Sequence, residues 1–318
     1  MPIIQSEFRA AWWLPGAHAQ TIWPSLVRRR ILPEISWERV ELEDGDFIDL
    51  AWSGPEDGRI VLFMHGLEGS LQSHYAGGIM RQLNQKGFRV CLMHFRGCSG
   101  EPNRLSSSYH SGKTDDPQQI VEHIQSAQGK ETYAAVGVSL GGNVLLKWLG
   151  EQGASMSLQK AVAVSVPFQL DEAACRLRIG LSRLYQHHLL TQLRDKYRQK
   201  FEPIHSPLDV DIDAMKTFRQ FDHQVTAELH GFDGVDDYYR RCSSRQYIPR
   251  IRVPTLILHA KHDPFVFPET APAEDELPDN VWLEMPESGG HVGFVRGLIP
   301  GWADYWAEQR ITQWLSME

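Results

Sequence analysis

Short, almost continuously apolar runs recur along this chain, and longer stretches with a helical pattern separate them. Ile60 to His65 and Arg89 to Phe95 are two such runs, and Tyr75 to Lys86 has the pattern of a helix that ends at Gly87. Runs without polar alternation are typical of strands that are buried on both faces. Strands that alternate with helices indicate a mostly parallel sheet with crossover helices. We therefore predict an α/β fold with a central sheet flanked by helices.

The same alternation extends toward both ends of the chain. Residues 36–43 and 46–52 alternate polar and apolar side chains around Asp44-Gly45, which predicts an antiparallel hairpin at a sheet edge. Asp115-Asp116-Pro117 predicts a helix start in which a carboxylate caps the first turn. Further strands are expected at residues 132–138, 160–166, 255–260 and 281–285, and further helices at residues 142–150 and 302–315.

One region, residues 168–250, breaks this pattern. It carries no strong strand signal, and Leu177 to Phe201 has helical character throughout. We predict a helical insertion between two strands of a single domain that spans residues 1–318. Because the insertion leaves the sheet at the carboxyl ends of the strands, where open α/β sheets bind ligands, we expect a lid or cap. The alternative is an extra helical layer beside the sheet. If the insertion is a lid, we expect it to pack down through an apolar face that contains Leu177, Leu181, Leu184 and Tyr185.

Composition excludes some functions. There are 40 acidic residues against 32 Lys and Arg, a net charge of −8, which argues against a dedicated nucleic-acid binder because such proteins need a basic face. The four cysteines form no C-x-x-C pair and favour a reducing setting. The first ten residues lack the pattern of a signal peptide, and no apolar run approaches the ~18 residues that span a bilayer. We therefore expect a cytoplasmic protein without stable membrane insertion.

Gly137-Val138-Ser139-Leu140-Gly141 matches the pattern G-x-S-x-G. The pentapeptide is common by itself, but here a buried strand runs into it and a helix leaves it, which is the setting of a nucleophile elbow. The sharp turn strains the backbone of Ser139, and only small neighbours leave room for it. Ser139 is therefore the candidate nucleophile. The alternative is a plain glycine-rich turn.

A serine hydroxyl needs a base, and the base needs an orienting acid. In proteins with such an elbow the chain order is serine, acid, histidine. Asp263 follows the strand at residues 255–260, and His291 follows the next strand. We assign Asp263 as the acid and His291 as the base. His262 is the main rival for the base, but it neighbours Asp263 in sequence and could not easily point its ring back at that carboxylate.

The strand at residues 60–65 opens into His65-Gly66-Leu67-Glu68-Gly69-Ser70, an H-G-x-x-G loop in the place of an oxyanion loop. The tetrahedral intermediate of acyl transfer carries a negative charge, which fixed backbone N–H groups stabilise by a few kcal/mol. We assign these donors to the backbone N–H groups of Leu67 and of Leu140, the residue after the nucleophile. No H-E-x-x-H or comparable ligand spacing is present, so no metal site is predicted.

With these segments in place, the sequence resembles the α/β-hydrolase superfamily, and within it the YheT-like family of esterases. The resemblance extends over nearly the whole chain. It depends on five segments, which are Trp13 to Thr21, His65 to Ser70, His94 to Gly100, Tyr109 to Asp116 and Gly137 to Asn143. It implies a triad of Ser139, Asp263 and His291, hydrolysis of carboxylic esters and no cofactor. Relatives in this group include membrane-anchored lipid hydrolases and alcohol acyltransferases, whose N-terminal membrane helix we do not expect here.

The residues thus predict a serine esterase that acts on a small-molecule ester, short-chain or lipid-like, through an acyl-enzyme. The first alternative is an alcohol acyltransferase, in which an alcohol instead of water takes the acyl group from the same triad. The second is a binding module that keeps the fold without the chemistry. Labelling of Ser139 by a serine-reactive fluorophosphonate separates the binding module from the enzymes, and acyl transfer from an ester to an added alcohol separates the two enzymes.

Overall fold

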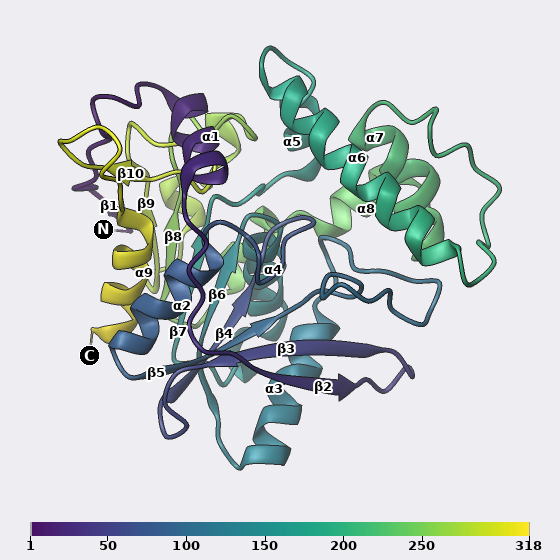
Figure 1. Cartoon of the computed structure of the whole chain (residues 1–318), viewed down its shortest axis with the longest axis horizontal. Coiled ribbons are helices and arrows are strands. Elements are labelled where there is room, and N and C mark those ends of the chain that lie inside the picture. Colours follow the sequence, from purple (N-terminus) through teal and green to yellow (C-terminus); the bar gives the residue numbers. More distant parts are fainter. Residues whose placement is uncertain (1, 318) are drawn as a thin grey trace.

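One sheet of nine strands runs through the protein, whose structure is a computed structural model that describes residues 2–317 (Figure 1). In order across the sheet the strands are β1 (Ile3–Ile4), β9 (Val281–Glu284), β8 (Thr255–Leu258), β7 (Lys160–Val164), β6 (Thr132–Val138), β4 (Arg59–Met64), β5 (Phe88–Met93), β3 (Phe47–Ser53) and β2 (Ser36–Glu41). All neighbours from β1 to β5 are parallel, whereas β3 is antiparallel to both β5 and β2. The prediction of a mostly parallel sheet with a hairpin at its edge is confirmed.

Helices cover both faces of the sheet. α2 (Ala76–Gln85) and α9 (Trp306–Ser316) pack against one face, and α3 (Asp115–Gln128) and α4 (Leu140–Gln152) pack against the other. A hydrophobic core lies on each face of the sheet. Successive residues of β4 pack alternately into one core and the other, so this strand is buried on both faces. A strand in that position has no solvent-facing side, which explains its continuous apolar sequence.

Two features near the ends of the chain differ from the prediction. The C-terminal helix α9 begins at Trp306 rather than at residue 302, because β11 (Asp304–Tyr305) pairs antiparallel with β10 (Val295–Arg296) just before it. Strand β1 was not predicted at all. Its two residues carry too little pattern, and they pair with β9, which lies near the other end of the chain.

The expected carboxylate cap of α3 is also absent. The helix begins at Asp115, and its N-cap residue, Thr114, makes no side-chain cap hydrogen bond. Asp116 is buried and instead accepts hydrogen bonds from the Arg96 guanidinium at 2.6 and 2.9 Å. A buried guanidinium needs a carboxylate partner because an unpaired charge in the interior is costly. This ion pair therefore fastens the start of α3 to the loop after β5.

Residues 168–250 connect β7 to β8 without contributing a strand, as predicted, and we call this segment the insertion. It contains α5 (Leu170–Arg176), α6 (Ser182–Phe201), α7 (Phe218–Phe221), a π-helical turn (Asp222–Ala227), α8 (Val235–Cys242) and a 3-10 turn (Arg245–Arg250). Its helices α5 to α8 form the teal and green group in the upper right of Figure 1. The prediction of one helix from Leu177 to Phe201 is wrong. The chain turns at Gly180, whose φ of +55° favours glycine.

The turn at Gly180 also changes which side of the insertion packs inward. Leu181 and Leu184 are 60% and 64% exposed, so the prediction that they pack down is wrong. The buried positions at the start of α6 are instead Ser182, Gln186 and Leu190. These positions are spaced by four residues and share one helix face, on which Leu181 and Leu184 do not lie.

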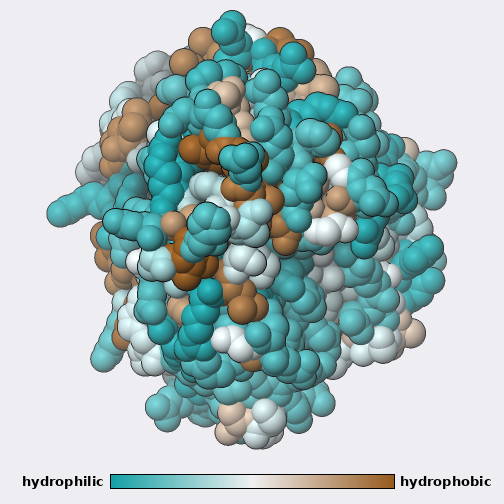
Figure 2. Space-filling model, turned by 90° about the vertical axis from the view of Figure 1, so that its right-hand side faces the viewer, coloured by the Kyte–Doolittle hydropathy of each residue, from teal (hydrophilic) through white to brown (hydrophobic). Residues whose placement is uncertain are grey.

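The surface on the insertion's side of the molecule is mostly hydrophilic, and hydrophobic side chains gather near the centre of this face (Figure 2). Within residues 2–317, no helix combines the length and the apolar character that crossing a bilayer would require.

Candidate active site

Ser139 stands at the sharp turn between β6 and α4, with φ +53° and ψ −118°. A non-glycine residue held at positive φ stores strain that the surrounding structure must sustain. Close packing sustains it here. A Cβ on Gly137 would meet the Gly141 carbonyl oxygen at 2.4 Å, and a Cβ on Gly141 would meet the His65 carbonyl oxygen at 2.5 Å. Both glycines of the motif are therefore required for space, in the strand–turn–helix setting that the sequence predicts.

The structure brings Ser139, His291 and Asp263 into one hydrogen-bonded chain. The Nε2 atom of His291 lies 2.8 Å from the Oγ atom of Ser139. Its Nδ1 atom lies 2.9 and 3.1 Å from the two carboxylate oxygens of Asp263. With Nδ1–H donating to the carboxylate, Nε2 is left as the acceptor for the serine hydroxyl. The geometry is that of a nucleophile, a base and an orienting acid.

Asp263 lies directly behind His291 and is only 2% exposed. Burial alone would raise the pKa of its carboxyl group, but the charge and hydrogen bond of His291 and the backbone N–H of Phe265, which donates at 2.8 Å, together hold that pKa below its usual value. Asp263 is therefore ionised at neutral pH and acts only as a hydrogen-bond acceptor. The rival histidine, His262, is exposed, and among the described residues it is His291, not His262, that hydrogen-bonds the Asp263 carboxylate.

An aromatic stack supports the His291 ring from the side. The ring of Phe265 stacks on it with centroids 3.8 Å apart and planes 11° from parallel. Tyr185 of α6 stacks in turn on Phe265, with centroids 4.9 Å apart. The sequence analysis missed Phe265. Its position two residues after Asp263 was the available signal, because a side chain so near the acid in sequence can reach the His291 ring that the acid orients.

The loop of Leu67 lies against the serine. A Cβ on Gly66 would come within 3.2 Å of the Ser139 Cβ, and Leu67 and Leu140 both line the cavity onto which Ser139 opens. Leu140 is the first residue of α4, so its backbone N–H has no acceptor within the helix. The two assigned backbone donors thus lie on the two segments that flank the serine.

Two tyrosines that the sequence analysis missed hold this loop. The Tyr75 hydroxyl accepts the Gly66 N–H at 2.8 Å, and the Tyr109 hydroxyl accepts the Glu68 N–H at 2.9 Å. The residues on both sides of Leu67 are therefore fixed. Tyr109 lies in a segment noted in the family resemblance, but nothing in its local pattern identifies its distant partner.

His65, which begins the loop, supports the structure through both ring nitrogens. Its Nδ1 lies 2.8 Å from the Gly66 carbonyl oxygen, and its Nε2 accepts the Phe95 N–H at 3.1 Å. Burial lowers the pKa of His65 to about 3, so the ring stays neutral.

Among residues 2–317, no group of three or more His, Cys, Asp or Glu side chains is arranged to hold a metal ion.

The N-terminal helix α1 (Ala17–Val27) packs directly on the loop that carries His291. The Thr21 hydroxyl accepts the His291 backbone N–H at 2.9 Å. Cβ atoms on Gly290 and Gly293 would meet the carbonyl oxygens of Ala17 and Gln20 at 2.4 and 2.1 Å. Backbone therefore lies against backbone at this contact, and both glycines are needed for it.

Two further side chains complete the support of the histidine loop. Gln20 accepts the Val295 N–H at 2.7 Å and donates to the Val295 carbonyl at 3.1 Å, as a strand partner would. The Ser165 hydroxyl accepts the Val292 N–H at 2.9 Å. The segment Trp13 to Thr21, noted in the family resemblance, thus gains a physical role, because it holds the backbone of the candidate base.

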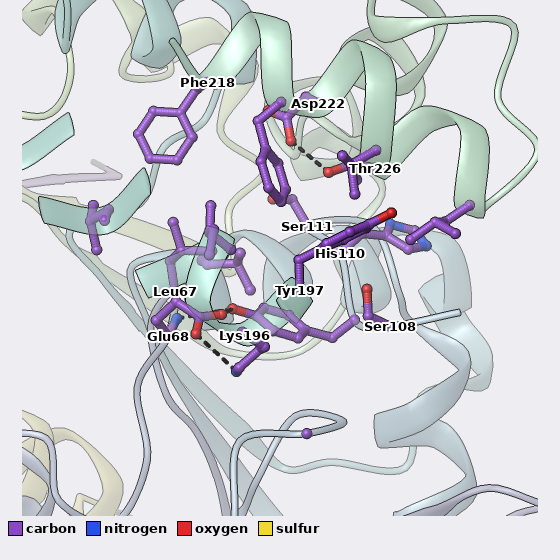
Figure 3. Close-up of a pocket in the computed structure, with 18 of the residues that line it drawn as sticks. Leu67, Glu68, Ser108, His110, Ser111, Lys196, Tyr197, Phe218, Asp222 and Thr226 are labelled. Carbon is purple, nitrogen blue, oxygen red and sulfur yellow. Dashed lines mark hydrogen bonds and ion pairs between the residues drawn. The ribbon is translucent and has the colours of Figure 1, made fainter. Parts of the chain in front are cut away.

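Ser139 and His291 open onto a cavity of ≈ 200 Å³ that the insertion shares. Leu170, Leu177 and Leu193 of the insertion line it together with the candidate catalytic residues. Figure 3 shows the pocket with Leu67 and Glu68 below and Phe218 and Asp222 above. The insertion therefore forms one wall of this cavity, which we call the chamber.

The fold and this arrangement define an α/β hydrolase. A family model described as the alpha/beta hydrolase fold matches residues 59–298, and the chain therefore belongs to this family. Among curated proteins, the candidate esterase YheT of Escherichia coli (strain K12) is 41% identical, over 98% of this chain and 93% of that protein. The resemblance found in the sequence is confirmed at this level.

More distant relatives span a similar share of the chain. The phospholipase ABHD3 of Bos taurus is 26% identical, over 96% of this chain and 77% of that protein. Among solved structures, the esterase Pf2001 of Pyrococcus furiosus aligns with a TM-score of 0.59 at 18% identity, over 89% of this chain and 90% of that chain. At that identity the structural match shows the fold alone.

The contact of Thr21 with the histidine loop generates a prediction. Replacing Thr21 with Val keeps the shape but leaves the buried His291 N–H without its acceptor, which shifts the loop. We expect labelling of Ser139 by a fluorophosphonate to slow at least ~10-fold, because small displacements of catalytic groups carry large rate costs. Thr21→Ser retains the hydroxyl and should label at close to the wild-type rate. Equal rates for Thr21→Val and wild type would contradict the role of this contact.

Proposed function

We propose that this protein is a carboxylic ester hydrolase that works through Ser139, His291 and Asp263. The proposal rests on one observation above all, the continuous hydrogen-bonded chain from the Ser139 hydroxyl through His291 to Asp263 at the wall of a cavity. The esterase and phospholipase names of the relatives agree with it. A binding module has no need for a strained serine aligned with a base and an acid.

In the first half of the reaction the Ser139 Oγ attacks the ester carbonyl carbon while His291 Nε2 takes the hydroxyl proton. Asp263 stabilises the imidazolium that forms, and it can do so because its own pKa is held low. The carbonyl oxygen becomes an oxyanion, for which the N–H groups of Leu67 and Leu140 are the proposed donors. The His291 proton then passes to the departing alcohol, and Ser139 is left acylated.

In the second half a water molecule replaces the alcohol. His291, neutral again, takes a proton from the water as it attacks the acyl-enzyme carbonyl. Collapse of the second tetrahedral intermediate returns the proton to Ser139 and releases the acid. Every proton in this scheme moves between the substrate, water, Ser139 and His291, so the scheme needs no cofactor.

The cavity favours substrates with a short enclosed chain. A cavity of ~150 Å³ holds one benzene molecule, and the cavity beside Ser139 is somewhat larger at ≈ 200 Å³. A group of a few carbons fits entirely inside it, whereas a longer chain must extend through the opening. The leucine side chains that the insertion contributes suit an apolar group.

Replacing Ser139 with Ala should lower turnover of p-nitrophenyl butyrate at least ~10³-fold, because the nucleophile is removed. The variant should also lose fluorophosphonate labelling, read as a mass increase of the intact protein. Ser126→Ala is the matched control, because Ser126 is exposed on α3. Retention of most activity by Ser139→Ala would overturn the proposed function.

Replacing Asp263 with Asn should lower kcat by ~10³-fold or more without loss of folding, because the amide favours the wrong tautomer of His291. The matched control is Asp236→Asn, whose carboxylate is 80% exposed and pairs with Arg219. Steady-state kinetics of both variants with the same ester, with circular dichroism as the folding check, measures the difference. Similar kcat values for the two variants would show that Asp263 is not the acid.

We further propose that the insertion acts as a lid that selects the acyl chain. Leu193 of α6 lines the cavity, whereas Leu181, the N-cap residue of the same helix, is exposed. Leu193→Trp fills part of the chamber and should reduce kcat/KM for an octanoate ester about 10-fold relative to an acetate ester, since pocket volume discriminates chain length on this scale. Leu181→Trp should leave that ratio unchanged. Identical ratios for the two variants would favour a helical layer that takes no part in selection.

A further inference from the structure

Asp222 is a carboxylate inside the substrate chamber that the proposed mechanism does not use. It begins the π-helical turn Asp222–Ala227 of the insertion and lines the same cavity as Ser139. In Figure 3 it lies above the chamber, joined to Thr226. The residue is half-buried, and it lines the cavity.

Within residues 2–317, the side chains that donate hydrogen bonds to this carboxylate are neutral. The hydroxyl of Thr226 donates to Oδ1 at 2.8 Å, and the hydroxyl of Tyr239 donates to Oδ2 at 2.7 Å. Burial raises the pKa of Asp222 to about 6 although both hydroxyls lower it. The group is therefore still largely ionised at neutral pH, and it carries its charge into an interior where charge is costly.

Glu68, the other acidic side chain that lines the cavity, does have a cationic partner. Glu68 forms an ion pair with Lys196 at 3.0 Å. The ammonium of Lys200, which also lines the chamber, donates to Asn103 and to the Ser107 carbonyl at 2.6 Å each. Among the described residues, no basic side chain forms an ion pair with Asp222. The described residues thus leave the Asp222 carboxylate without a cationic partner.

The local backbone and the neighbouring rings favour a ligand at this point. π-helical turns are rare, and they occur frequently at functional sites. Phe218, Phe221 and Tyr238 line the cavity on the same part of the insertion. Aromatic faces attract cations, most strongly where water is excluded.

We propose that Asp222 binds a cationic ammonium group of the substrate. This inference rests on the proposed function in that the ester bond of the same molecule reacts at Ser139. A permanent ammonium compensates the buried charge and contacts the aromatic rings, whereas a neutral hydroxyl gains one hydrogen bond and leaves the charge uncompensated. The substrate class is therefore an ester that carries a quaternary or primary ammonium group.

Binding to a variant that cannot turn over substrate tests the proposal. In Ser139→Ala, calorimetry compares hexyltrimethylammonium with hexanol, which shares the alkyl chain and lacks the charge. We expect the cation to bind at least ~10-fold more tightly, a factor within the range of a desolvated cation–π contact and a buried ion pair. Equal or weaker binding of the cation would overturn the proposal without any further variant.

A second variant assigns the preference to Asp222. In Ser139→Ala/Asp222→Asn the amide keeps the size of the side chain, and we expect cation binding to weaken about 10-fold while hexanol binding is unchanged. Adding Asp236→Asn to Ser139→Ala instead is the matched control, because Asp236 is exposed and paired with Arg219. If cation and alcohol weaken equally, Asp222 only joins α8 to the π-helical turn, and the proposal is wrong. Because these readouts require no hydrolysis, they are independent of whether Ser139→Ala confirms the esterase reaction.

Discussion

The strained turn at Ser139 is the constraint on which the geometry of this site depends. A serine at φ +53° persists only where its surroundings leave no other conformation. Here the glycines at 137 and 141 bring β6, α4 and the end of β4 into backbone contact, and Gly66 brings the Leu67 loop against the serine. The same close packing that strains the serine therefore sets where the two proposed oxyanion donors lie relative to its hydroxyl.

The three members of the hydrogen-bonded chain could be predicted because each follows a buried strand. Ser139, Asp263 and His291 come after β6, β8 and β9, which are parallel members of one sheet. The carboxyl ends of parallel strands meet at one edge, so residues that are far apart in sequence converge there. The continuous apolar runs that mark such strands are local signals, and this is why the fold and the candidate triad were accessible from sequence.

Features that depend on a partner far away in the sequence could not be predicted from the sequence. Thr21 acts on His291 from near the other end of the chain, and Tyr109 acts on the Glu68 N–H from another loop. Neither residue belongs to a local pattern that names its partner. The packing face of the insertion was misassigned for a different reason. One glycine at position 180 breaks the helix, and the periodicity of Leu177 does not continue into Leu184.

Helix α6 joins the insertion to both halves of the site. Lys196 pairs with Glu68, the residue after the proposed donor Leu67, and Tyr185 stacks on Phe265, which stacks on the His291 ring. The Glu68 carboxylate is nearly buried, so separating the pair would leave a charge with little solvent to replace its partner. Both contacts come from one helix of 20 residues. If α6 moves, it must therefore either take Glu68 and Phe265 with it or break its contacts with both. The position of the insertion is in this way coupled to the proposed oxyanion loop and to His291.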